Sequence, residues 1–275
     1  MKVGIMHSDV LITGVALLNQ TSILIGAGLL VLFAFYGWLA LRSSARAVLT
    51  TKPFGLPDAI WGGILALGMI FSLLCSIRSP IQLITFPDLL MNSVLYGALV
   101  LGIIGVIGFQ RHSAISIFQL QPSRFPKAAV TGLLWLLITY PLILAIQGTV
   151  QHFSGDTDDT QLIIRYFVEH PDLKNRILVI FMVLVVAPIA EEIIFRGYFY
   201  GIIRRYCGRI PALLTSSLLF TAIHGNLAAA PGLFFLAITL CLLYERTGTL
   251  WASMTLHAAF NTSTIIALIL APGAA

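Results

Sequence analysis

The chain alternates between long apolar runs and short polar segments, and several of the apolar runs approach 20 residues in length. A helix that crosses a bilayer needs about 20 predominantly apolar residues, and its backbone polar groups must find partners without water. We therefore predict an all-α fold, a polytopic membrane helix bundle with about eight transmembrane helices. The predicted spans cover approximately residues 21–41, 58–77, 89–109, 128–148, 177–203, 210–228, 230–245 and 250–271.

The composition agrees with this pattern. Of the 275 residues, 58% are hydrophobic and 10% are charged, and the mean hydropathy is +0.95. A soluble domain carries about 25% charged residues, so a soluble globular protein is excluded. The net charge of +5 comes from basic residues in short loops, which indicates membrane topology and gives no reason to expect a nucleic-acid partner.

Loop charge also predicts an orientation and a location. Basic residues are more frequent in the loops that follow spans one, three, five and seven than in the other loops. Because cytoplasmic loops carry an excess of Lys and Arg, we predict that these loops are cytoplasmic and that both termini lie outside. We expect an integral protein of the bacterial cytoplasmic membrane.

The distribution of ionisable residues divides the chain into three parts. We expect the intramembrane ionisable groups to lie in spans five to eight, so residues 1–150 form a scaffold of the first four helices. Residues 151–175 form an acidic extramembrane loop, in which a short interfacial helix over 162–168 is the alternative to the solvated loop that we expect. Residues 176–271 form the helix bundle that carries the chemistry.

Span five contains two adjacent carboxylates and an arginine, Glu191, Glu192 and Arg196. Charged groups at membrane depth cost roughly 2.5–3.5 kcal/mol each on insertion scales, and they usually mark a site. Glu192 and Arg196 are spaced i and i+4, which favours an ion pair on one helix face. Glu191 is rotated about 100° from Glu192 and is left as a candidate general base. A structural ion pair without catalysis is the alternative.

Spans six and eight supply polar side chains at a similar depth. At 1.5 Å per residue from the basic loops, the expected depths are about 20 Å for Glu191, 22 Å for His224, 16 Å for His257 and 22 Å for Asn261. His257 and Asn261 are also spaced i and i+4, so they share one helix face. We predict one shared site, although a hydrogen-bonded core histidine or an interhelical hydrogen bond would explain each residue alone.

These residue types suit the attack of water on a peptide carbonyl. Glu191 would accept the proton of the water and His224 would help to position it, while His257 and Asn261 would donate hydrogen bonds to the oxyanion. No HExxH motif occurs, which excludes a thermolysin-like zinc helix. We expect no cofactor, but zinc held by His224, His257 and a glutamate is an alternative, and so is a non-catalytic membrane scaffold, immunity or regulatory protein.

Three motifs occur in order along the last four spans: Glu191-Glu192-Ile-Ile-Phe-Arg196, Phe220-Thr-Ala-Ile-His224 and His257-Ala-Ala-Phe-Asn261. They resemble the EExxxR, FxxxH and HxxxN motifs of the CPBP family, which comprises CAAX proteases and bacteriocin-processing enzymes and is also called Abi. The resemblance covers roughly residues 176–271. It implies an intramembrane glutamic endopeptidase in which Glu191 and His224 activate water, His257 and Asn261 form the oxyanion hole, and Glu192, Arg196 and Phe220 support the site. Its partner in the bilayer would be a membrane-associated protein or peptide substrate.

Overall fold

The computed structural model describes residues 53–78, 84–154 and 162–270. Contacts divide the chain into two units, residues 1–46 and 47–275, and the described residues belong to the second unit. The predicted span over residues 21–41 therefore lies outside the described part. Every regular element in that part is helical, in the order α2 (Leu56–Arg78), α3 (Phe86–Phe109), α4 (Ala114–Phe118), η1 (Pro122–Arg124), α5 (Phe125–Ser154), α6 (Leu162–Glu169), α7 (Leu173–Phe181), η2 (Met182–Val186), α8 (Ala187–Glu191), η3 (Glu192–Phe199), α9 (Tyr200–Cys207), α10 (Arg209–Ile223), α11 (Ala230–Thr247) and α12 (Leu250–Leu270).

Six helical stretches in the described residues are long and apolar enough to cross a membrane, and α10 is a shorter apolar helix. Together they correspond to the seven predicted spans that lie in this part of the chain, so the all-α polytopic fold is confirmed. The predicted boundary of the sixth span is wrong, because α10 ends at Ile223 and the chain turns over residues 224–229.

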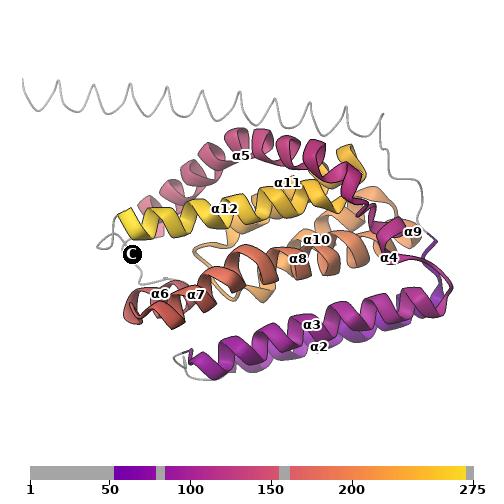
Figure 1. The fold of residues 1–275 in the computed structure, drawn as a ribbon, viewed down its shortest axis with the longest axis horizontal. Coiled ribbons are helices and arrows are strands. Elements are labelled where there is room, and N and C mark those ends of the chain that lie inside the picture. Colours follow the sequence, from indigo (N-terminus) through magenta and orange to yellow (C-terminus); the bar gives the residue numbers. More distant parts are fainter. Residues whose placement is uncertain (1–52, 79–83, 155–161, 271–275) are drawn as a thin grey trace, which may run out of the picture. The chain divides into compact units, whose positions relative to one another are not determined.

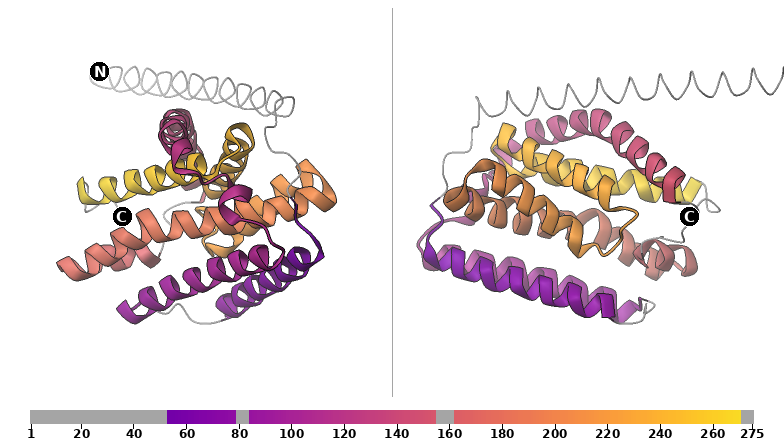
Figure 2. Two further views of the ribbon diagram at one scale, coloured as in Figure 1. Left: turned by 45° about the vertical axis from the view of Figure 1, so that its right-hand side comes forward. Right: turned by 180° about the vertical axis from the view of Figure 1, so that it is seen from behind.

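The helices form layers around one long helical rod. The rod consists of α7, η2, α8, η3 and α9, which run continuously over Leu173–Cys207. The antiparallel pair α2 and α3 lies on one side of the rod, and α12 lies on the other side with α5 packed against it (Figures 1 and 2). Helix α11 contacts α10, α5 and α12, and each residue from Leu240 to Glu245 is buried.

The outward faces of α2, α3 and α5 are apolar. Leu67, Leu101 and Leu137 each expose about 70% of their surface, at 69%, 69% and 70%. Soluble monomers rarely expose large contiguous apolar patches, whereas lipid accepts such side chains without cost. The chain is therefore an integral membrane protein, as predicted.

The rod departs from regular α-helix on both sides of Glu191. In η2 the N–H of Ala187 donates to the carbonyl of Met182, five residues back, and Pro188 has no N–H to donate. In η3 the N–H of Tyr200 donates to the carbonyl of Phe195, again five residues back. Such π-type turns are rare and occur frequently at functional sites. They change the angular spacing of side chains in the part of the rod that carries the carboxylates.

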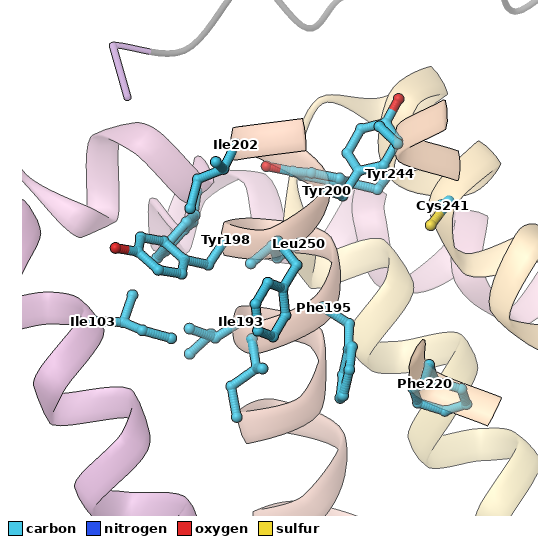
Figure 3. Close-up of a cluster of buried hydrophobic side chains, with 14 of the residues drawn as sticks. Ile103, Ile193, Phe195, Tyr198, Tyr200, Ile202, Phe220, Cys241, Tyr244 and Leu250 are labelled. Atoms are coloured by element: carbon cyan, nitrogen blue, oxygen red, sulfur yellow. The ribbon is translucent and has the colours of Figure 1, made fainter. Parts of the chain in front are cut away.

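The rod packs against an aromatic core. Ile193, Phe195 and Tyr198 project from the rod, with Ile103 of α3 on one side and Phe220 of α10 on the other (Figure 3). Gly197 and Gly201 form a GxxxG pattern, a spacing typical of closely packed membrane helices. Here both glycines contact aromatic rings instead: a Cβ would lie 2.9 Å from Phe118 at Gly197 and 2.2 Å from Phe54 at Gly201.

Asp58 corrects the expectation that ionisable groups are confined to spans five to eight. It lies in the first turn of α2 and exposes 1% of its surface. Its carboxylate accepts hydrogen bonds from the Gly55 N–H and from Gln110 Nε2, both at 2.8 Å, and it lies 3.3 Å from the hydroxyl of Tyr198. This carboxylate therefore fastens the start of α2 to the end of α3 and to the rod.

Part of the predicted acidic loop is helical. Residues Leu162–Glu169 form α6, and its side chains Tyr166 and Phe167 are buried, with exposures of 4% and 3%. The preference for a solvated loop was wrong there, because the two aromatic side chains pack against α7 and α12. Asp172 then caps α7 by accepting a hydrogen bond from the N–H of Asn175. The hydrogen bonds from Asn175 hold the pKa of Asp172 below its usual value.

Candidate active site

Four ionisable side chains meet in the interior of the bundle, and we call them the buried charge cluster: Glu191, Glu192, Arg196 and His257. Their exposed fractions are 5%, 0%, 0% and 3%. Arg196 Nη1 lies 2.9 Å from Glu192 Oε1, so the ion pair predicted from the i,i+4 spacing is present. Charges are buried this fully in proteins only when they are paired or hydrogen-bonded. The cluster joins the rod to α12.

His257 connects the two carboxylates. Its Nδ1 lies 3.1 Å from Glu192 Oε1, and its Nε2 lies 3.8 Å from Glu191 Oε2. An ionised carboxylate only accepts hydrogen bonds, so the contact with Glu192 requires a proton on Nδ1 of His257. Nε2 is then the ring nitrogen that faces Glu191. The carboxylate of Glu192 orients both Arg196 and His257.

Tyr96 of α3 also contacts the cluster, and the sequence analysis missed it. Its hydroxyl donates a hydrogen bond to Glu191 Oε1, with 2.5 Å between the oxygens. A tyrosine in an apolar helix is typical of a core residue, so the sequence alone does not mark Tyr96 as part of a site. A signal was available, because Tyr96 lies near the middle of its span and a buried tyrosine hydroxyl usually needs a partner.

Phe220 and His224 approach the cluster from α10. The guanidinium of Arg196 lies 4.2 Å from the centre of the Phe220 ring, and the Phe220 ring lies 5.8 Å from that of His257. His224 also packs against Phe220, with 4.6 Å between the two ring centres. His224 is therefore connected to the buried charge cluster through Phe220, and the structure describes no direct contact between His224 and Glu191.

The end of α10 explains how His224 is placed. His224 is the last residue of the helical path, and its Nδ1 lies 2.7 Å from the carbonyl oxygen of Phe220. Gly225 follows with φ of +63°, a left-handed conformation that turns the chain out of the helix. Helix α10 has 15 residues, so it spans only about 22 Å. Backbone that leaves a helix inside the hydrocarbon core of a membrane is tolerated where protein or a water-filled cavity surrounds it.

Asn261 makes a different contact from the one expected. Its Nδ2 donates to the carbonyl oxygen of Val183 at 2.8 Å, two turns before Glu191 along the rod. In a regular α-helix this carbonyl would accept a hydrogen bond from the N–H of Ala187, which donates to Met182 instead. In a π-type turn its donor would be residue 188, but Pro188 has no N–H. Asn261 therefore satisfies a carbonyl that the irregular rod leaves unpaired.

Glu245 forms a second buried group that the sequence analysis did not single out. It exposes none of its surface and accepts hydrogen bonds from the hydroxyl of Tyr200 and from Arg209, whose Nη2 lies 2.8 Å from Oε2. Arg204 Nη1 lies 3.3 Å from Oε1. This group joins α9, α10 and α11 at the end of the bundle that carries the basic loop residues, and it makes no contact with the buried charge cluster that the structure describes.

Two polar atoms of the buried charge cluster, Glu192 Oε2 and Arg196 Nε, have no hydrogen-bond partner among the described residues. Buried polar atoms are usually satisfied, so each such atom is a feature to explain. Across residues 53–78, 84–154 and 162–270, no group of three or more His, Cys, Asp or Glu side chains is arranged to hold a metal ion. The arrangement provides a carboxylate, imidazole rings and amide or hydroxyl donors for acid–base chemistry.

Comparison with known proteins identifies the segment that carries the cluster. Residues 173–263 match the sequence model of the Rce1-like family, described as "Type II CAAX prenyl endopeptidase Rce1-like". The protein named "Putative membrane peptidase YdiL" from Bacillus subtilis (strain 168) is 27% identical over 142 residues. That match covers 49% of this chain and 56% of the relative, so the chain spans little more than half of the relative's length. No solved structure matches the chain. The predicted resemblance to the CAAX protease family is confirmed over residues 173–263.

Proposed function

We propose that the chain is an intramembrane glutamic endopeptidase that hydrolyses a peptide bond of a membrane-associated protein or peptide. The observation that carries the proposal is the buried charge cluster, in which Glu191 Oε2 faces His257 Nε2 at 3.8 Å inside an apolar helix bundle. The match of residues 173–263 to a family of membrane endopeptidases supports it. Intramembrane ionisable groups face the bundle interior where they serve a site.

In the proposed reaction, Glu191 acts as the general base. Its Oε2 accepts a proton from a water molecule while the water oxygen bonds to the carbonyl carbon of the substrate, and the carbonyl electron pair moves onto its oxygen. The proton then passes from Glu191 to the amide nitrogen as the electron pair on the oxyanion re-forms the carbonyl and the C–N bond breaks, leaving a carboxylic acid and an amine. His224, placed at the end of α10, would help to orient the water. No cofactor enters the scheme.

His257 and Asn261 would stabilise the oxyanion. Because Nδ1 of His257 donates to Glu192, Nε2 can donate to an oxyanion only in the doubly protonated ring. In that form the buried charge cluster is neutral, with Arg196 and His257 balancing Glu191 and Glu192. Asn261 has two amide hydrogens, so it can satisfy Val183 with one and donate to the oxyanion with the other. Such preorganised donors often supply the largest part of a rate enhancement.

The substrate class is tested together with the activity. We expect cells that produce the wild-type chain to contain membrane peptides that are missing from cells producing Glu191→Gln. Glu169→Gln, which changes an exposed glutamate of α6, serves as the matched control and should give the wild-type peptides. Quantitative mass spectrometry of membrane peptides at equal protein levels measures the difference, and the new termini define the cleavage site and any prenyl group.

Two outcomes would contradict this proposal. If the peptides of the wild-type and Glu191→Gln cells are the same, the chain does not cleave through Glu191, and a scaffold or regulatory role is favoured. If cleavage by the purified chain is lost with a chelator and restored by zinc, the metal-dependent alternative through His224, His257 and a glutamate is favoured. We expect cleavage to persist in the chelator.

A further inference from the structure

Helix α3 presents one face to the rod along its whole length. Leu89, Ser93, Tyr96, Ile103 and Ile107 follow one another at spacings of three, four or seven residues, which places them on one side of a helix. Leu89, Ile103 and Ile107 are almost completely buried, at 2%, 0% and 1%. Helix α3 contacts α7, η2, α8 and η3, so this face meets the segment that carries Glu191.

Tyr96 makes the two oxygens of Glu191 different. Oε1 accepts the hydrogen bond from the Tyr96 hydroxyl at 2.5 Å, whereas Oε2 faces His257 Nε2 at 3.8 Å. A separation of 3.8 Å is longer than a direct hydrogen bond, and one water molecule can lie within hydrogen-bond distance of both atoms. The arrangement therefore leaves Oε2 open to a reacting water and Oε1 occupied.

We propose that Tyr96 is a positioning residue for the peptidase reaction, holding Oε1 of Glu191 so that Oε2 remains available as the base. The inference rests on the proposed function of Glu191. Tyr96 lies outside residues 173–263, so the family match assigns it no role. It makes α3 part of the active site.

The physical reason is competition between two partners for one flexible carboxylate. Without the Tyr96 hydroxyl, a small rotation of the Glu191 side chain would close the 3.8 Å gap and form a direct ion pair with His257. That pair would occupy both the proposed base and the proposed oxyanion donor. Substrate binding would be little affected, because neither group needs to contact the substrate away from the scissile bond.

A purely structural tyrosine would behave differently. Buried tyrosine hydroxyls generally find a hydrogen-bond partner, and removing such a bond lowers stability without changing the chemistry of a distant site. Tyr200 offers a matched comparison, because its hydroxyl also donates to a buried carboxylate, that of Glu245. Tyr200 lies about one turn beyond Arg196 along the rod, and the Tyr200–Glu245 pair makes no contact with the buried charge cluster that the structure describes.

The test measures kcat and KM separately for the purified full-length chain in liposomes. The probe is the membrane peptide whose Glu191-dependent cleavage is found in cells, synthesised with a fluorophore and a quencher. We expect Tyr96→Phe to lower kcat by roughly 10- to 100-fold, as for other misplaced catalytic groups, and to change KM by less than about three-fold. Tyr200→Phe should keep the wild-type kcat, and 3-fluorotyrosine at position 96, which retains the hydroxyl, should restore most of it.

Each result separates this inference from the proposed function. If Tyr96→Phe retains kcat within about two-fold while Glu191→Gln is inactive, Tyr96 has no positioning role and the proposed function stands. If Tyr96→Phe and Tyr200→Phe lower kcat equally, the effect is structural and the inference is overturned. If no peptide is cleaved in a Glu191-dependent way, the proposed function fails and this inference fails with it.

Discussion

Arg196 is completely buried, and its guanidinium contacts groups from three helices. It lies 2.9 Å from Glu192 of η3, its Nη2 donates to the carbonyl oxygen of Ala237 in α11 at 3.4 Å, and it lies over the ring of Phe220 in α10. The ring face adds a cation–π attraction that is strongest where water is excluded. Arg196 therefore holds the rod, α10 and α11 in register around the site.

Replacing Arg196 should be costly. In Arg196→Met the carboxylate of Glu192 would remain buried without its main partner, and breaking a buried pair in this way costs about 3–5 kcal/mol of unfolding free energy. Unfolding in mixed detergent micelles measures the loss. Arg205→Met removes an exposed arginine of the neighbouring α9 and should change the free energy by less than about 0.5 kcal/mol. Equal losses of unfolding free energy in Arg196→Met and Arg205→Met would contradict a specific contribution of the Arg196–Glu192 ion pair to stability.

The residues of the site differ in how far the sequence could predict them. Glu192 and Arg196 were assigned to each other because helical spacing fixes neighbours four residues apart, and that geometry is local. His257 was predicted to lie at a depth similar to that of Glu191 by counting residues from the basic loops, and in the structure it contacts Glu191 and Glu192. Tyr96 was not predicted, because its partner Glu191 lies 95 residues away and no local rule selects one helix of the N-terminal half over another.

Asn261 and the irregular rod form a unit across two elements. The π-type turn at η2 and Pro188 leave the carbonyl of Val183 without its regular donor, and Asn261 of α12 supplies one at 2.8 Å. An unsatisfied buried carbonyl would cost about 1–3 kcal/mol. Asn261 thus has a structural role in addition to the proposed catalytic one.

A double-mutant cycle separates these two roles. Asn261→Ala should lower the unfolding free energy by about 1–3 kcal/mol, and the loss should shrink in Pro188→Ala, because alanine restores a backbone N–H that can serve the freed carbonyl. The loss of kcat should be the same in both backgrounds if Asn261 also donates to the oxyanion. A stability loss that is unchanged by Pro188→Ala would contradict the assignment of Asn261 to Val183.

Helices α5 and α12 approach closely at Gly132. A Cβ at this position would lie 2.6 Å from the carbonyl oxygen of Ala252 and 3.1 Å from the N–H of Leu256, and both are backbone atoms. Backbone cannot rotate away as a side chain can. The space that Gly132 leaves therefore sets the position of α12 beside His257.

We expect Gly132→Ala to lower the unfolding free energy by about 1–3 kcal/mol and to lower cleavage activity, since α12 must shift. Gly148→Ala, on the same helix, has no atom of the described residues within 4 Å of its added Cβ, and it should be neutral or stabilise by up to about 1 kcal/mol. Thermal unfolding and cleavage assays on the two variants give the comparison. A Gly132→Ala protein as stable as Gly148→Ala would show that the close approach is not needed.

The sequence predicted which membrane-spanning helices are present, but it did not predict where each helix ends. The apolar runs predicted all seven spans of the described part because length and hydropathy are averaged over about 20 residues. The end of α10 depends on one glycine, Gly225, and the helix α6 depends on tertiary packing of Tyr166 and Phe167. Both were misjudged, because single conformational choices and distant contacts are weakly encoded in local composition.

In the whole bundle, the N-terminal half contributes more polar contacts than its apolar composition suggested. Helices α2 and α3 line one side of the rod (Figure 1), and they contribute Asp58 and Tyr96 to buried polar contacts. The match to the Rce1-like family covers residues 173–263, and Asp58 and Tyr96 lie outside it. The motifs thus predicted the half of the chain that carries the buried charge cluster. The polar contacts from α2 and α3 depend on how the helices pack, and the motifs did not predict them.

The central claim is that Glu191 activates water for peptide hydrolysis inside the membrane. It is tested most directly by the single-turnover rate at which the purified chain in liposomes cleaves its membrane peptide, for Glu191→Gln against Glu169→Gln. General-base catalysis contributes about 10²–10⁴-fold, so we predict that Glu191→Gln is at least about 100-fold slower while it binds the peptide and unfolds like the wild type. A Glu191→Gln protein that cleaves at the Glu169→Gln rate would contradict the account.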